Sequence, residues 1–218
     1  MNPTNRSTRS RPTRRRAVRS LAAALALSLG LAPATVSAAD TDGKFEAPML
    51  PAGAAAAALV PKPIAQALGS PRLAGGGDLR WFGMRLYSAQ LWVGPQGLRP
   101  KRLDADPFAL QLSYRLSLKG TAIAERSDEE IARMGIGDAQ RRSRWLSEMK
   151  RVFPDVASGD RLTGVHLPGT GTRFYHNDRP VGTIDDPAFG PAFFAIWLDD
   201  RTVAPQLRDA LLRDLNGR

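Results

Sequence analysis

The alternation of apolar and polar side chains over residues 108–118 limits most strongly what this chain can fold into. Successive side chains of a β-strand point to opposite faces, so the pattern predicts a half-buried strand of an antiparallel sheet. The polar face carries Gln111, Ser113, Arg115 and Ser117. The apolar face carries Phe108, Leu110, Leu112, Tyr114, Leu116 and Leu118.

Residues 79–93 alternate too, but their apolar face changes midway. Even positions from 82 to 86 are apolar, whereas odd positions become apolar from Tyr87 onward. Such a change predicts a bulge, a bend or a second strand, and the surplus apolar surface could also line a cavity. The segment is therefore one long strand or two. The preceding Gly75-Gly76-Gly77 lacks the Lys-Ser/Thr pair of a phosphate loop, and we expect a tight turn there.

Helical and strand patterns occupy separate parts of the remaining chain. Three short strands are predicted at 161–167, 172–176 and 181–184, with turns at Pro168-Gly169 and Asn177-Asp178. Helices are predicted at 121–134, from Asp138 to Phe153, at 187–198 and at 204–215, with a short helical turn at 64–68. This order favours an α+β fold: an antiparallel sheet with helices packed on one face.

The N-terminal segment resembles an export signal. Residues 1–39 contain seven arginines and no acid, followed by an apolar run over 21–32 and the small residues Val36-Ser37-Ala38-Ala39. This three-part pattern predicts a signal peptide cleaved near Ala38 or Ala39, and hence a periplasmic or secreted protein. The run is shorter than the ~20 residues of a membrane span. We expect a flexible linker over 40–61, one domain over 62–218 and no stable membrane insertion after signal removal.

Net charge and residue usage argue against several classes of function. The formal net charge is +10, and removal of the seven leader arginines leaves +3, which gives little support to nucleic acid binding. Cysteine is absent, and the only histidines, His166 and His176, lack a metal-ligand spacing. We therefore predict no metal site, no cofactor and no catalytic role for either histidine.

Three long stretches of the chain carry a further signal: GGGDLRWFGMRLYSAQLWV (75–93), FALQLSYRLSLKGTAIAERSDEEIARMG (108–135) and FPDVASGDRLTGVHLPGTGTRFYHNDRPVGTIDDPAFGPAFFAIWLDDRTVAPQLRDALL (153–212). These stretches resemble the bacterial chalcone isomerase-like proteins. The strongest cues are the glycine-rich lead into the tyrosine-bearing strand, GDRLTGVHLPG and AFFAIWLDDRTVAPQLRDALL. The resemblance implies an antiparallel sheet with helices on one side and a ligand cleft between them.

The resemblance also bears on chemistry. Plant enzymes of this fold close a chalcone to a flavanone with an arginine, a threonine, a tyrosine and an asparagine around an apolar cleft. Their strand threonine falls at Tyr87 here, their tyrosine and asparagine fall near Lys119 and Arg126, and only Arg80 stands near their arginine. None of the first three residue types is kept in this chain. Arg80 also lies closer in sequence to Tyr87 than the arginine of the plant enzymes lies to their threonine. The resemblance thus implies the cleft without chalcone cyclisation.

Other members of this superfamily bind fatty acids, which suggests a binding protein. We expect a small apolar ligand, a fatty acid or flavonoid-like molecule with one anionic or phenolic end. The polar contacts expected are Arg80, Tyr87 and Arg126, and the apolar lining expected is Phe82, Met84, Leu86 and Trp145. A true isomerase remains the alternative, with Arg80, Lys119 or Arg126 stabilising a phenolate or enolate. An adaptor domain that binds a protein partner through exposed apolar surface is a third reading.

Overall fold

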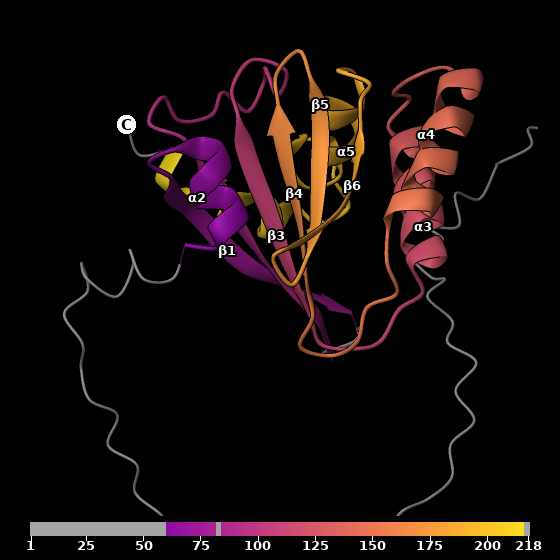
Figure 1. Ribbon diagram of the computed structural model, residues 1–218, viewed down its shortest axis with the longest axis horizontal. Coiled ribbons are helices and arrows are strands. Elements are labelled where there is room, and N and C mark those ends of the chain that lie inside the picture. The colour runs from indigo at the N-terminus through magenta and orange to yellow at the C-terminus, as the bar shows by residue number, and fades with distance from the viewer. Residues whose placement is uncertain (1–59, 82–83, 216–218) are drawn as a thin grey trace, which may run out of the picture. The chain divides into compact units, whose positions relative to one another are not determined.

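The computed structural model of the protein describes residues 60–81 and 84–215. Within them, six strands form one antiparallel sheet in which each strand pairs with the next along the chain (Figure 1). The strands are β1 (Arg72–Trp81), β2 (Met84–Val93), β3 (Phe108–Tyr114), β4 (Arg161–Leu167), β5 (Gly171–His176) and β6 (Arg179–Ile184). The helices are α2 (Lys62–Leu68), α3 (Gly120–Arg133), α4 (Ala139–Val152), α5 (Phe189–Leu198) and α6 (Pro205–Leu211), followed by the 3₁₀ turn η1 (Arg213–Leu215).

The predicted α+β class and antiparallel sheet are confirmed. The region 79–93 belongs to two strands, because β1 and β2 pair antiparallel up to Trp81 and Met84 on either side of residues 82–83. The pairing also shifts by one residue between Leu79–Tyr87 and Arg80–Arg85, which leaves Leu86 as an extra residue in β2. This bulge explains why the apolar face changes there in the sequence.

The strand predicted at 108–118 ends earlier, at Tyr114, and it is buried on both faces rather than half-buried. On the face predicted to be exposed, Ala109 packs in the cluster formed with α2, and the buried Gln111 side chain donates a hydrogen bond to the Thr163 hydroxyl at 3.0 Å. Beyond it, Leu118 forms an isolated bridge with Val156, where the chain runs toward α3.

The glycines Gly75, Gly76 and Gly77 lie within β1, so the predicted turn is wrong. A β-carbon on Gly75 would lie 2.6 Å from the carbonyl oxygen of Leu211, and one on Gly77 would lie 3.0 Å from the β-carbon of Ala210. The absence of side chains therefore allows α6 to pack directly against the backbone of β1. Glycine in a strand serves such a close approach as readily as it serves a turn.

Helices cover the two faces of the sheet unequally. The main core lies between one face and α3, α4, α5 and α6, as predicted. In addition, the short α2 covers part of the opposite face, where Ile64 and Leu68 pack with Trp92, Ala109 and Val165. Figure 1 shows α2 in front of the strands, α5 behind them, and α3 and α4 side by side.

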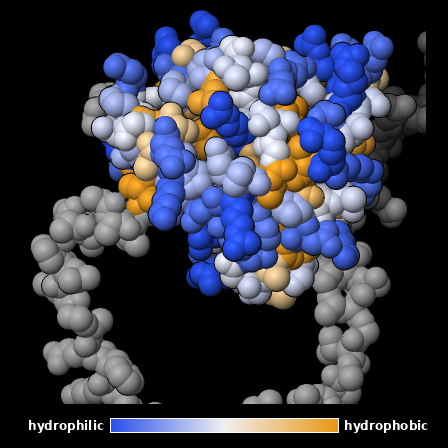
Figure 2. Space-filling model, in the orientation of Figure 1, coloured by the Kyte–Doolittle hydropathy of each residue, from blue (hydrophilic) through white to orange (hydrophobic). Residues whose placement is uncertain are grey.

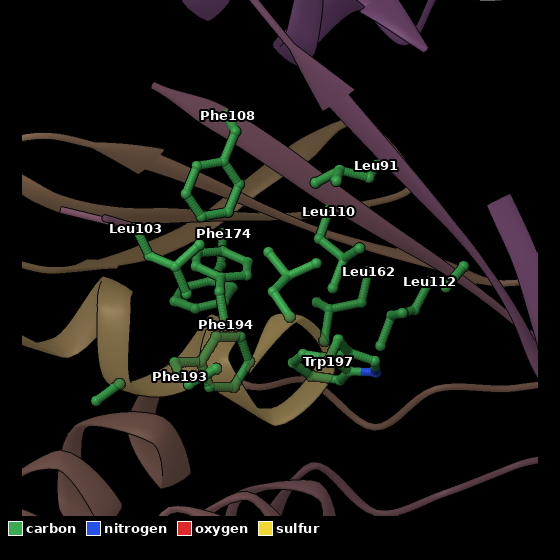
Figure 3. Packing of buried hydrophobic residues seen from close by; sticks show 14 of the residues in the cluster. Leu91, Leu103, Phe108, Leu110, Leu112, Leu162, Phe174, Phe193, Phe194 and Trp197 are labelled. Carbon is green, nitrogen blue, oxygen red and sulfur yellow. The ribbon is translucent and has the colours of Figure 1, made fainter. Parts of the chain in front are cut away.

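The helix α5 is apolar on nearly all sides because it lies between the sheet and the other helices. Its aromatic side chains form the centre of the main core, in contact with Phe108 and Phe174 from the sheet (Figure 3). Most of these rings meet edge to face at centroid separations near 5–6 Å, the arrangement that aromatic quadrupoles favour. The aromatic residues of α5 are Phe189, Phe193, Phe194 and Trp197.

Candidate functional site

A group of polar side chains lies where β2 and β3 approach the end of α5. The indole N–H of Trp197 donates a hydrogen bond to the phenol oxygen of Tyr87 at 2.9 Å. Tyr114 pairs with Tyr87 across β2 and β3, and its ring meets that of Tyr87 edge to face with centroids 5.9 Å apart. Strand alternation positions both tyrosines on the helix-covered face. The sheet therefore directs two phenols toward α5 at one level.

The helix α3 adds charged groups beside Tyr87. Glu130 is buried and pairs with Arg126 one turn before it and with Arg133, whose Nε lies 2.8 Å from a Glu130 oxygen. Arg126 also pairs with the exposed Glu129 at 2.9 Å. A buried carboxylate is stable only when it is paired, and the two arginines meet that need. The side chain of Arg126 is 45 % exposed and so links the buried group to solvent.

The electrostatic surroundings keep Tyr87 protonated. Burial is the largest influence and raises the pKa of Tyr87 to about 12. The charge of Glu130 raises this pKa as well, whereas the hydrogen bond from Trp197 and the charge of Arg126 lower it. Burial also raises the pKa of Tyr114 well above its usual value. At neutral pH both side chains are therefore neutral phenols that can donate a hydrogen bond to an anionic or carbonyl oxygen.

The apolar layer next to this polar group is packed closed. A void of about 10 Å³ remains between the sheet and α5, which is far below the few hundred Å³ of a usual ligand pocket. Figure 3 shows leucines of the strands directed toward the aromatic rings of α5. The void is lined by Leu110, Leu112, Leu162, Gly164, Phe174, Phe193, Phe194 and Trp197.

Comparison with known proteins shows which family has this fold. The family model described as chalcone isomerase-like matches residues 69–213, most of the described chain. The chain belongs to the chalcone isomerase-like family. Among solved structures, it is similar to a fatty-acid binding protein of Arabidopsis thaliana, with a TM-score of 0.50 and 13 % identity, over 66 % of this chain and 87 % of that one. At that identity the likeness shows the fold alone. No curated protein sequence matches the chain.

Two of the polar residues expected at the site of this chalcone isomerase-like chain come together, and one does not. Tyr87 and Arg126 lie within one electrostatic group. Arg80 instead lies at the end of the β1–β2 hairpin, exposed, with its guanidinium 3.6 Å from Asp78. Asp78 also pairs with Arg85 and accepts a hydrogen bond from the hydroxyl of Ser88. Asp78 and Ser88 face each other in the register beside the Leu79–Tyr87 pair, so they lie on the opposite face of the sheet from Tyr87.

The expected apolar lining is scattered. Met84 is 60 % exposed, Leu86 is half-buried, and Phe82 lies outside the described residues. Trp145 is buried, but its ring packs on Phe189 and its N–H binds Asp186 at 2.8 Å. Phe189 and Trp197 lie at opposite ends of α5, about 12 Å apart at the helical rise per residue. Trp145 therefore belongs to the far end of the core.

Three residues of the Tyr87 group were missed by the sequence analysis: Trp197, Glu130 and Tyr114. The burial of Glu130 could have been predicted, because it lies three positions after Ser127 on the buried face of α3. An acid on a buried stripe flanked by Arg126 and Arg133 indicates a paired internal carboxylate. Trp197 and Tyr114 read as ordinary core residues, and nothing local distinguishes them.

The cations proposed for the isomerase alternative are held apart by different carboxylates. Arg80 pairs with Asp78, Lys119 pairs with Asp155 at 2.7 Å, and Arg126 pairs with Glu129 and Glu130. Stabilisation of a phenolate or enolate requires donors that converge on one oxygen. The described side chains do not supply that convergence.

The structure also bears on metals, membranes and protein partners. No cluster of three or more His, Asp or Glu side chains that could bind a metal occurs within residues 60–81 and 84–215. In the same part of the chain, no helix combines the length and the hydropathy of a bilayer span. Figure 2 shows polar and charged side chains over most of the visible face, with apolar ones in small separate patches. That face offers no broad apolar surface of the kind that protein partners use.

Proposed function

We propose that this chalcone isomerase-like protein is exported and binds a small apolar ligand that carries one anionic or phenolic end. Binding takes place between the sheet and α5, without chalcone cyclisation. The observation that carries the proposal is the position of Tyr87, Trp197 and Arg126 at the border of an otherwise apolar layer. A few placed polar groups beside an apolar interior are the usual design of a small-molecule site.

The fold family supports a ligand of this kind. The Arabidopsis thaliana protein of similar fold is a fatty-acid binding protein. In the present chain, the Tyr87 hydroxyl, the Trp197 N–H and the partly exposed Arg126 guanidinium supply hydrogen-bond donors for a carboxylate or phenol. The apolar part of the ligand lies against the leucines and phenylalanines of the core.

Binding requires the apolar layer to open, because the present void of about 10 Å³ holds no ligand. The element that moves is α5, whose Phe193 and Trp197 fill the space beside the strands. The apolar part of the ligand then takes the place of Phe193 and Trp197 against the strands. The hydrogen bond between Trp197 and Tyr87 breaks, and both groups form hydrogen bonds to the polar end of the ligand.

The test is calorimetric titration of the purified full-length protein with palmitate and with the flavanone naringenin, after solvent extraction and mass spectrometry of whatever co-purifies. Arg126→Gln removes a cation from the group and is expected to weaken palmitate binding about tenfold. Arg144→Gln removes an exposed arginine of α4 and serves as the matched control. Equal affinities of the two variants, or no binding of either compound by the unaltered protein, would rule the proposal out.

A further inference from the structure

A second concave surface lies at a different place in the fold, between α6 and the loop that follows β2. It is a groove of about 390 Å³. Its lining combines three apolar and three cationic side chains and contains no carboxylate. The lining residues are Leu98, Arg99, Pro100, Lys101, Arg208 and Leu212.

The groove is built on fixed apolar groups. Leu98 and Leu212 are buried members of the main core, so they hold the loop and the end of α6 in place. The loop is held further by Asp106, which accepts hydrogen bonds from the backbone N–H of Arg99 at 3.1 Å and from its guanidinium. The shape of the groove is therefore set by packing and does not depend on a ligand.

The charges around the groove are unevenly compensated. Asp106 binds Arg99 through two parallel hydrogen bonds of 2.9 Å, and Asp104 binds Arg102 in the same way. Lys101 stands between these two pairs, is exposed, and has no ion-pair partner among the described residues. The loop thus carries one ammonium group beyond what its carboxylates neutralise.

Arg208 closes the other side of the groove. Its Nε donates to the carbonyl oxygen of Leu198 at 2.9 Å, and its terminal nitrogens pair with Asp200 and Asp209. Its head group is thereby committed to α5 and its neighbours, and its stem contributes apolar surface to the groove. In Arg99, the Nη1 atom makes no hydrogen bond to any described residue, which leaves it free for an anion beside Lys101.

We infer that this groove is a binding site for a small amphiphilic anion, separate from the site proposed above. The apolar ring or short chain of the ligand lies on Leu98, Pro100 and Leu212, and its single anionic group meets Lys101 and the Nη1 edge of Arg99. The pairing of an apolar floor with an uncompensated cation selects this chemistry over neutral or cationic ligands. The groove begins beyond Val93, whereas Tyr87 lies about 20 Å away along β2.

The probe is 1-anilinonaphthalene-8-sulfonate, an aromatic sulfonate whose fluorescence rises in apolar surroundings. Lys101→Glu reverses the charge at the groove and is expected to weaken binding at least tenfold, with Lys101→Gln intermediate. Lys62→Glu makes the same change on the exposed side of α2 and is expected to leave affinity unchanged. Circular dichroism confirms that each variant keeps its melting temperature, since loosened proteins bind this dye nonspecifically.

Backbone and indole N–H shifts in NMR spectra distinguish the two sites. Binding in the groove moves the signals of Arg99 and Lys101, whereas binding near α5 moves the indole signal of Trp197. If Lys101→Glu and Lys62→Glu bind the dye equally, or if the shifts centre on Trp197, the groove proposal fails. Palmitate binding weakened by Arg126→Gln but not by Lys101→Glu supports the first site whatever the outcome at the groove.

Discussion

The indole N–H of Trp197 binds the phenol oxygen of Tyr87 at 2.9 Å, a contact that joins α5 to β2 across 110 positions of the chain. It is the polar connection between the aromatic helix and the sheet at the border of the proposed ligand site. The bond links α5 to β2, and its loss has a measurable energetic consequence.

Tyr87→Phe is expected to lower the free energy of unfolding by about 1–3 kcal/mol, because the buried N–H of Trp197 then lacks its acceptor. Urea denaturation followed by circular dichroism measures the change. Tyr175→Phe on the opposite face of the sheet is the matched control. If the two variants have the same stability, the bond does not hold α5.

Gly75→Ala is expected to destabilise the protein by about 1–3 kcal/mol, the usual cost of overpacking. The added methyl group would meet the backbone of α6, with the Leu211 oxygen 2.6 Å away, and backbone atoms cannot move aside as a side chain can. Thermal unfolding measures the effect. Gly94→Ala, whose new methyl would have its nearest neighbour at 3.8 Å, is the control. Equal melting temperatures would mean that α6 does not pack on β1 as described.

His166 predicts a dependence of stability on pH. Its imidazole is fully buried beside Phe108 and Phe194, and neither ring nitrogen has a hydrogen-bond partner among the described residues. Burial lowers the pKa of His166 to about 4, against a partly opposing effect of the Asp104 charge. The unfolded chain takes up the proton near pH 6.5, so the free energy of unfolding falls as the pH drops from 6.5 to 4.

The contribution of His166 to that slope is at most about 1.4 kcal/mol per pH unit. His166→Leu removes the titrating group and is expected to flatten the profile in this interval, whatever its stability at pH 8. Urea denaturation at half-unit steps of pH provides the measurement. A variant whose slope matches that of the unaltered protein would show that His166 is not the group responsible.

Export predicts a specific mature N-terminus. Protein recovered from an osmotic-shock fraction is expected to begin near Ala39 or Asp40, because the small residues before them fit a signal-peptidase site. N-terminal sequencing gives the answer directly. An intact Met1 in the cytosolic fraction contradicts export, and it would also restore the full charge of +10 to the working protein.

Local chemistry determined much of this fold. Alternation identified β3 and the face that it turns toward the helices of the main core, although not the burial of its other face. Asp138 caps α4 as expected, because its side chain accepts a hydrogen bond from the backbone N–H of Arg141 at 2.8 Å. Asn177 and Asp178 form the predicted turn with φ of 48° and 68°, a conformation that these residue types tolerate. Each of these features depends on neighbours a few positions away, so the sequence alone was sufficient to predict it.

The tertiary structure decided which distant residues meet. Gly75 is a packing surface because α6 happens to cross β1, and the same glycines would suit a turn equally well. Trp145 and Trp197 look alike as buried tryptophans, yet only Trp197 lies at the end of α5 that reaches Tyr87. Such contacts depend on where helices lie on the sheet, which is set by the packing of the whole core and leaves no local pattern in the chain.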